Sequence, residues 1–242
     1  MQLKSKETLK LMAIAMCLFA CGSASCVTAT FSGSTVTEDA TLYSDNTSSN
    51  NGGGPTAYVG ATESHGLRHM LLRFNVASIP SNASVTSVSL AMLMTKAPAT
   101  GPSPTPQRLH RVTRAWTEGT STGTGANGLV TSGTATWSSA QLNTTAWTTP
   151  GGDFVAGSSA TTNIGSLTFS TFTWSSATMV ADVQGWVTNA AQNFGWIVIG
   201  DEATQKSARE YASSEGAVSD QPVLTVTYTA VISAVRDWQL FN

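Results

Sequence analysis

Two residues, Arg209 and Tyr211, carry side chains that together suit an acidic sugar. They are two positions apart, so in a strand they lie on one face, opposite Glu210. A planar guanidinium pairs with a carboxylate, and an aromatic ring stacks on a pyranose. We therefore predict a ligand-binding patch here, with ordinary solvated charge as the alternative. The basic residues expected to extend the patch are Arg68, His69, Lys206 and Arg111.

A second pair of charges, Arg73 and Glu210, is predicted to be structural. Arg73 shares a strand face with Leu71, and Glu210 shares a face with Ala208 and Ala212. A charge on a crowded face needs a partner. We expect a bidentate bridge between Arg73 and Glu210 that braces two neighbouring strands. A role in ligand binding or catalysis is the alternative for this pair.

Four residues in the first quarter of the chain could supply hard oxygen ligands to calcium: Asp39, Asp45, Asn46 and Asn51. Their spacing matches no EF-hand loop, and Asp and Asn also form turns without any metal. A structural calcium ion is therefore an open possibility, and no other cofactor is expected.

We expect a protein that is not an enzyme. The sequence has no P-loop and no HExxH motif. A glycosidase needs two carboxylates facing across a cleft, and nothing marks such a pair among the sparse acids. A polysaccharide lyase or hydrolase is the alternative, because Tyr211, His69 and Arg209 could supply a base and a cation.

Residues 1–29 have the pattern of a secretory signal peptide, with a basic start, a short apolar run and small residues at the end. The apolar run, Leu11–Ala20, is shorter than the roughly 20 residues that span a bilayer. Cleavage before Thr30 is expected, and lipidation of Cys21 is the alternative. No cysteine follows Cys26, so no disulfide framework is expected. The protein is predicted to be secreted or held at the cell surface, without a transmembrane span.

Charge excludes one class of partner. Removing the leader would reduce Lys and Arg from 12 to 9 and Asp and Glu from 14 to 13, leaving a net charge of about −4. A nucleic-acid partner would require a basic stripe, so none is expected. Charged residues make up only 11% of the chain, against roughly 25% in average globular proteins. Ser, Thr, Asn and Gly replace them, as is common in secreted β proteins.

Alternation of apolar residues predicts strands along most of the chain. The clearest run is Gly66–Pro80, in which Met70, Leu72 and Phe74 share one face. The other expected strands are 27–33, 38–44, 56–60, 84–95, 108–116, 134–137, 164–169, 171–175, 196–200, 207–213 and 222–229. A Pro-rich loop is expected at 96–107. Apolar residues at a spacing of three and four predict one amphipathic helix at about 178–191.

Short strands separated by turns favour a sandwich or barrel over βαβ units. We predict an all-β, antiparallel β-sandwich of the jelly-roll kind, formed by one domain at 30–229. Residues 230–242 are expected to form an apolar extension. They either pack on their own domain or dock on a neighbouring copy, because an exposed strand edge accepts such a segment.

The order of several short motifs resembles the DNRLRE domain family over about residues 36–229. The matching residues are Asp39, Leu42 and Tyr43; Asn50–Gly53; Tyr58–Gly60; Arg68 with Leu71–Phe74; Ile79-Pro80; Val85 with Ser89-Leu90; Arg111–Thr113 and Trp116; Thr136-Trp137; Asp182-Val183 with Trp186-Val187; Gly195-Trp196; Ser207 with Arg209-Glu210; and Pro222, Leu224, Val226 and Tyr228. The 96–107 loop, the 231–242 tail and the lack of a catalytic domain depart from the pattern.

The resemblance implies a secreted β-sandwich module related to the carbohydrate-binding modules of polysaccharide-degrading enzymes, including enzymes that act on alginate. Trp137 falls at a core position of the family, whereas Trp147 and Trp174 are expected to be freer. The predicted function is non-catalytic binding of an extracellular polysaccharide, with acidic and neutral polysaccharides as the alternatives. The alternative is a structural subunit of a cell-surface polymer that self-associates through 231–242.

Overall fold

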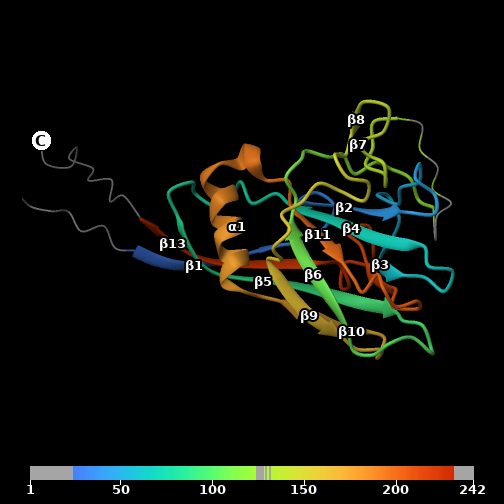
Figure 1. The fold of residues 1–242 in the computed structure, drawn as a ribbon. Helices are drawn as coiled ribbons and strands as arrows, with labels where there is room; N and C mark the ends of the chain where they lie inside the picture. The colour runs from blue at the N-terminus through green and yellow to red at the C-terminus, as the bar shows by residue number, and fades with distance from the viewer. Residues whose placement is uncertain (1–23, 124–127, 129, 131, 232–242) are drawn as a thin grey trace, which may run out of the picture.

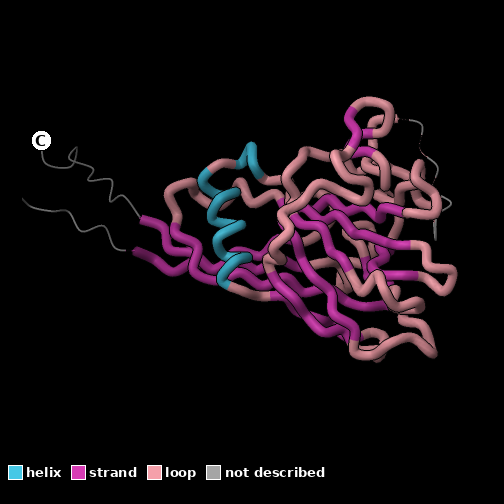
Figure 2. Tube along the Cα trace, in the orientation of Figure 1, coloured by secondary structure: helices cyan, strands magenta, loops and turns pink. Residues whose placement is uncertain are grey.

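The computed structural model describes residues 24–123, 128, 130 and 132–231. Its fold is mostly antiparallel β with one short α-helix, which confirms that part of the prediction (Figures 1 and 2). The strands are β1 (Ala24–Phe31), β2 (Thr37–Tyr43), β3 (Thr56–Ala61), β4 (Leu67–Phe74), β5 (Ser84–Lys96), β6 (Thr105–Arg111), β7 (Ser139–Gln141), β8 (Thr145–Ala146), β9 (Ala160–Ile164), β10 (Ser170–Trp174), β11 (Trp196–Ile199), β12 (Arg209–Ala212) and β13 (Val223–Val231).

Eleven of the described strands form one sheet with the order β1-β13-β5-β12-β3-β4-β11-β6-β9, while β10 pairs with β5 and β2 pairs with β4. The sheet curls into a half-barrel and does not form a clear two-layer sandwich (Figure 1). The reason lies in the middle of the order. β12 pairs with β5 and β3, and β3 pairs with β4, so hydrogen bonding runs from one half of the sheet to the other.

The inside of the half-barrel is filled by a large apolar core. β4 supplies Met70, Leu72 and Phe74, as its alternation predicts, and these side chains are fully buried. β5 and β13 supply alternate residues to the same core, among them Leu90 and Val226. Burial of such side chains stabilises the fold by roughly 1.5–3 kcal/mol each.

One helix, α1 (Ala177–Thr188), packs on β5 and joins this core. It begins at Ser176, whose Oγ accepts a hydrogen bond from the Met179 amide at 3.0 Å. Met179, Val183 and Trp186 form its buried face, which confirms the predicted helical period. The helix ends at Thr188, eight residues before Trp196 of β11. The centroids of the Trp186 and Trp196 rings lie 4.5 Å apart.

The connection between β6 and β9 comprises residues 112–159, and its described part packs on the outer face of the sheet. A second apolar cluster joins it to β2, β4 and β11. In this cluster Trp116 and Trp147 from the connection pack with Leu71 of β4 and Ile197 of β11. Both faces of β4 are therefore buried, which explains why apolar residues occur on both sides of this strand.

Three predicted strands differ from the structure. The strand expected at 164–169 does not form there, because β9 spans Ala160–Ile164 and Phe169, with φ of 57°, lies in the turn before β10. The strand expected at 108–116 is β6, which begins at Thr105 inside the expected Pro-rich loop. Pro106 lies opposite Asn163 of β9 but before β6 begins to pair with β11 at Arg108, so β6 is paired on one side only at this position, where proline is tolerated. The strand expected at 134–137 does not form, and β7 and β8 make a separate small sheet just after it.

The ends of the chain bear on two further predictions. β1 begins at Ala24, so the last part of the predicted 1–29 leader lies in a strand that pairs with β13. Residues 1–23, including Cys21, and residues 232–242 of the predicted extension lie outside the described residues. Among the residues that the structure describes, no helix is long and apolar enough to cross a membrane.

Candidate functional site

The predicted patch at Arg209 and Tyr211 is not on the surface. Both side chains are buried, with 1% and 0% of their area exposed. Arg209 donates to the carbonyl oxygens of Gly165 and Ser207, and the Tyr211 hydroxyl donates to Gln107 Oε1 at 2.8 Å. The two residues do share a face, as predicted, but it is the face that points into the half-barrel. The prediction of an exposed binding face on this strand was therefore wrong.

The predicted bridge between Arg73 and Glu210 was also wrong. Arg73 pairs with Glu38, which lies directly opposite it in the register of β2 and β4. Glu210 instead accepts a hydrogen bond from Thr95 Oγ1 at 2.8 Å. The cause is the strand order, because β3 lies between β4 and β12 and keeps the two side chains apart.

The other predicted ligand-binding cations are paired at separate places. Arg68 is buried and donates to both carboxylate oxygens of Asp45, at 2.8 and 2.9 Å. The Arg111–Asp182 and Lys206–Glu63 ion pairs are formed at 3.2 and 2.7 Å. His69 is the one member of the predicted set that lines the cleft described next.

This open cleft of about 910 Å³ lies between the sheet and the β6–β9 connection. β4 supplies His69, the chain after β11 supplies Glu202, and the connection supplies the opposite wall. The charged and aromatic residues that line the cleft include His69, Arg114, Trp137, Asp153, Phe154 and Glu202. The cleft exists because the second apolar cluster holds the connection against the sheet without filling the space beside β4.

His69 sits at the base of the cleft, with both ring nitrogens in hydrogen bonds. Nδ1 lies 2.7 Å from the Gly151 carbonyl oxygen, and Nε2 lies 2.7 Å from Glu202 Oε1. The hydrogen bond from His69 lowers the pKa of Glu202, against the effect of burial. Both partners are oxygen atoms that accept hydrogen bonds, and together they fix the orientation of the imidazole ring. The Trp137 ring packs on the imidazole at 4.6 Å.

Arg114 and Asp153 form a second charge pair in the cleft wall. Arg114 Nε and the backbone amides of Thr148 and Thr149 all donate to the Asp153 carboxylate. Burial alone would raise the pKa of Asp153, but these hydrogen bonds outweigh it and lower the pKa. The cleft therefore holds two carboxylates with lowered pKa values, Glu202 beside His69 and Asp153 beside Arg114.

Aromatic side chains complete the lining. Trp137 and Phe154 are half-buried, so part of each ring faces the cleft. A cleft with an exposed indole and several fixed hydrogen-bonding groups suits a sugar ring. No family model and no curated protein matches the chain. The case for this cleft therefore rests on its own geometry.

Sequence reasoning missed Trp137 and most of the cleft. Trp137 was expected in the core, whereas Trp147 and Trp174, expected to be freer, are 5% and 0% exposed. The available signal was the setting of Trp137 among Thr and Ser in a segment that does not form a strand. The letters GxSxG at Gly119–Gly123 were also missed, but this irregular segment is not the strand-to-helix turn that the hydrolase motif requires.

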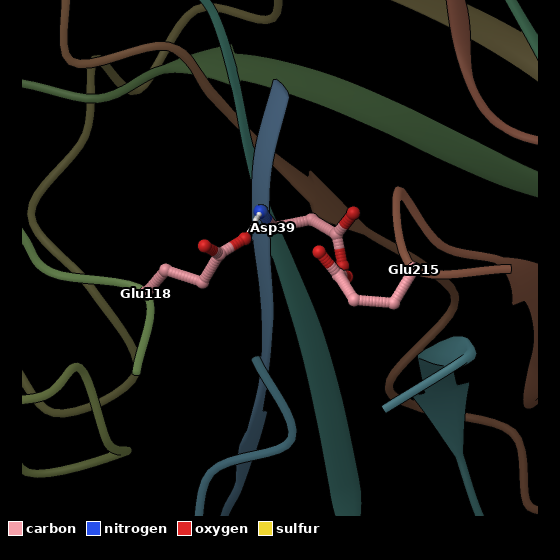
Figure 3. A group of neighbouring side chains, drawn as sticks. All are labelled: Asp39, Glu118 and Glu215. Carbon is pink, nitrogen blue, oxygen red and sulfur yellow. Dashed lines mark hydrogen bonds between the residues drawn. The ribbon is translucent and has the colours of Figure 1, made fainter. Parts of the chain in front are cut away.

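A separate group of acids gathers around Asp39 of β2. Ligand oxygens of Asp39, Glu118 and Glu215 lie within 4.8 Å of one another. Figure 3 shows the Asp39 and Glu215 carboxylates facing each other, with Glu118 reaching the Asp39 amide. Four residues were predicted to bind calcium. Among the described residues, Asp39 is the one of these four that belongs to the acidic group. The other three are Asp45, which pairs with Arg68, Asn46 in the turn after β2, and Asn51, which donates to the Thr56 carbonyl.

Burial controls the protonation of this acidic group. It raises the pKa of Asp39 to about 7 and that of Glu118 to about 8, and it also raises the pKa of Glu215. Repulsion from Glu215 adds to the effect on both of the other acids. The Ser214 amide donates to Asp39 Oδ2 at 2.7 Å, which partly offsets it. Three ionised carboxylates at this distance would repel one another strongly. The group must therefore either hold at least one proton or bind a cation.

Proposed function

We propose that this protein is a non-catalytic module that binds an extracellular polysaccharide in the cleft beside β4. The observation that carries the proposal is the half-buried indole of Trp137, which faces a cleft whose charged groups are held in fixed positions. An indole face gives apolar contact to one side of a sugar ring, and fixed polar groups orient its hydroxyls.

The protonation states in the cleft support binding over hydrolysis. A glycosidase needs one carboxylic acid that stays protonated until it reaches the leaving group, which requires a raised pKa. Both Glu202 and Asp153 have lowered pKa values, so neither can fill that role. His69 already contacts two acceptors, which leaves it no free nitrogen to act as a base. The acids with raised pKa values, Asp39, Glu118 and Glu215, do not line the cleft.

The balance of charge favours a neutral sugar over an acidic one. Arg114 is paired with Asp153 and His69 with Glu202, so neither basic side chain is free for a uronate. A sugar hydroxyl can donate to a carboxylate and accept from its basic partner without breaking the pair. We therefore propose that the ligand is a neutral polysaccharide, in place of the acidic ligand that Arg209 and Tyr211 suggested.

The proposal includes a family and a location. We propose that the curled sheet is a variant of the jelly-roll-like β-sandwich of DNRLRE-type modules, secreted or held at the cell surface. Its support is the sequence resemblance and the signal-like leader, together with the antiparallel order of the strands. A carbohydrate-binding module of this kind needs no catalytic domain in the same fold.

Affinity gel electrophoresis tests the function. The native protein is run through gels that contain one neutral or one acidic polysaccharide, and we expect retardation in at least one neutral gel. Trp137→Ala should abolish this retardation, because it removes the stacking surface. Phe169→Ala is the matched control, since Phe169 is 75% exposed and does not line the cleft. Equal retardation of native protein and Trp137→Ala, with the fold intact, would contradict the proposal.

A further inference from the structure

We propose that Asp39, Glu118 and Glu215 bind a calcium ion. This site differs from the ligand set that the sequence suggested, and it lies apart from the cleft. The three acids come from three distant parts of the chain, namely β2, the start of the β6–β9 connection and the loop between β12 and β13. An ion bound here would therefore join parts of the fold that no described strand pairing connects directly.

The spacing of the ligand oxygens fits calcium. One oxygen from each of the three acids lies within 4.8 Å of the others. Calcium binds oxygens at about 2.3–2.6 Å, so two oxygens on opposite sides of one ion are up to about 5 Å apart. Magnesium demands near-ideal octahedral geometry and gives up its waters reluctantly, whereas calcium accepts an irregular set of carboxylates such as this one. Calcium takes six to eight oxygens, which leaves room for water or carbonyl ligands beside the three carboxylates.

A second observation points to a ligand. Asp39 is fully buried, and its Oδ1 has no hydrogen-bond partner among the described residues. This carboxylate faces Glu215 inside the acidic group (Figure 3). A buried carboxylate oxygen without a partner is costly, and folded proteins satisfy the great majority of such atoms. An ion in the group would give that oxygen its missing partner.

No nearby Arg or Lys side chain among the described residues forms an ion pair with the acidic group. The cation that acts electrostatically on Glu118 is Arg73, and Arg73 is already paired with Glu38 and lies over the Trp116 ring. Asp39, Glu118 and Glu215 take part in none of the ion pairs formed by the described residues. The group therefore has three acids and no paired cation of its own.

The backbone around Glu118 is closely packed, which restricts movement of Glu118 away from Asp39. The Glu118 Oε1 accepts a hydrogen bond from the Asp39 amide at 2.5 Å, which ties the connection to β2. A Cβ on Gly52 would lie 2.4 Å from the Glu118 carbonyl oxygen, so the backbone of the 50–54 loop packs directly on Glu118. An ion bound here would fasten the start of the same connection that builds one wall of the cleft.

Isothermal titration calorimetry with CaCl₂ tests the site on protein first treated with EDTA. We expect one calcium ion to bind near neutral pH, and we expect it to raise the melting temperature more than MgCl₂ does. Glu215→Gln should weaken calcium binding at least tenfold. Asp220→Asn, in the same loop but outside the acidic group, is the matched control and should bind as the native protein does. Glu118→Gln provides a second variant if Glu215→Gln fails to fold.

The outcomes separate this inference from the proposed function. Trp137→Ala should bind calcium normally even where it no longer binds polysaccharide, because Trp137 is not in the acidic group. Absence of calcium binding to folded native protein, or equal binding by Glu215→Gln, would overturn the site. In that case the acids share protons in place of a metal, and polysaccharide binding would be tested independently by the gels.

Discussion

At the scale of single residues, Glu202 gives the cleft a defined response to pH. The hydrogen bond from His69 lowers its folded pKa below the ordinary value of 4.5. A carboxyl group with a depressed pKa stabilises the fold above its unfolded pKa, and this contribution is lost as the pH falls through the folded value. The Glu202 side chain is 40% exposed, so solvent screening limits the contribution to less than about 1 kcal/mol.

We therefore expect the melting temperatures of native protein and Glu202→Gln to differ at about pH 6 and to converge at about pH 3. Thermal unfolding followed by circular dichroism across this range measures the difference. Glu63→Gln is the control, because Glu63 is 80% exposed and lies outside the cleft. If the difference in melting temperature between native protein and Glu202→Gln stayed constant with pH, the contact with His69 would not lower the pKa of Glu202.

Asp182 is the charged residue whose removal should cost most. Its buried carboxylate accepts hydrogen bonds from Ser159 Oγ at 2.5 Å and Trp196 Nε1 at 2.9 Å, and it pairs with Arg111. Asp182→Ala leaves both donors without a partner, so we expect a loss of roughly 3 kcal/mol in the free energy of unfolding.

Urea denaturation measures the effect of Asp182→Ala, and Glu38→Gln is its comparison. Glu38 also belongs to an ion pair, with Arg73, but its side chain is 42% exposed. An exposed pair contributes about 1 kcal/mol or less. Similar losses for the two variants would mean that burial does not set the energetics of these charges.

At the scale of elements, glycines show where two strands meet too closely for a side chain. Gly195 precedes β11 with φ of 74°, and a Cβ there would lie 2.2 Å from the Leu72 carbonyl oxygen of β4. Gly195→Ala should therefore disrupt the β4–β11 pairing and destabilise the domain by roughly 2 kcal/mol or more.

Gly185 gives the opposite expectation within the same protein. It lies inside α1, and a Cβ there would meet nothing within 4 Å. Gly185→Ala should stabilise the domain by roughly 0.5–1 kcal/mol, because alanine loses less backbone entropy in a helix. Chemical denaturation of both variants checks the pair. Destabilisation by Gly185→Ala would point to a contact of α1 that its packing on β5 does not reveal.

Most elements could be predicted from the sequence because their signals are local. The alternation in β4 and the helical period of α1 follow from residues a few positions apart, and both elements form where expected. Partners of charged residues could not be predicted in the same way. Arg73 had a suitable carboxylate at Glu38 and another at Glu210, and only the order of strands decides between them.

The candidate site was harder to predict than the fold. Alternation correctly separates Arg209 and Tyr211 from Glu210, but it does not say which face the half-barrel encloses. The cleft depends on the β6–β9 connection, where no periodic pattern indicates how Trp137 and Asp153 reach His69. The acidic group has the same character, since its members are brought together only by the complete fold.

At the scale of the whole molecule, β1 is the strand at one edge of the curled sheet (Figure 1). Every residue of Ala24–Ala29 lies opposite a residue of β13, from Val231 to Val226. A chain that began at Thr30, the predicted cleavage point, would keep only the last two pairs. The other side of β13 would remain bonded to β5, so the sheet would survive but with a long new edge.

We therefore expect a chain starting at Thr30 to melt about 3–6 °C below one starting at Ala24, from a loss of about 1–2 kcal/mol in backbone pairing. It should also aggregate more readily, because β13 would present an unpaired edge with apolar Val226 and Tyr228 beside it. Differential scanning calorimetry and light scattering compare the two chains. If they behave alike, β1 is dispensable and processing before Thr30 remains the better prediction. If they differ as expected, cleavage before Thr30 would remove a stabilising strand, and we predict that mass spectrometry of secreted protein would find Ala24 retained.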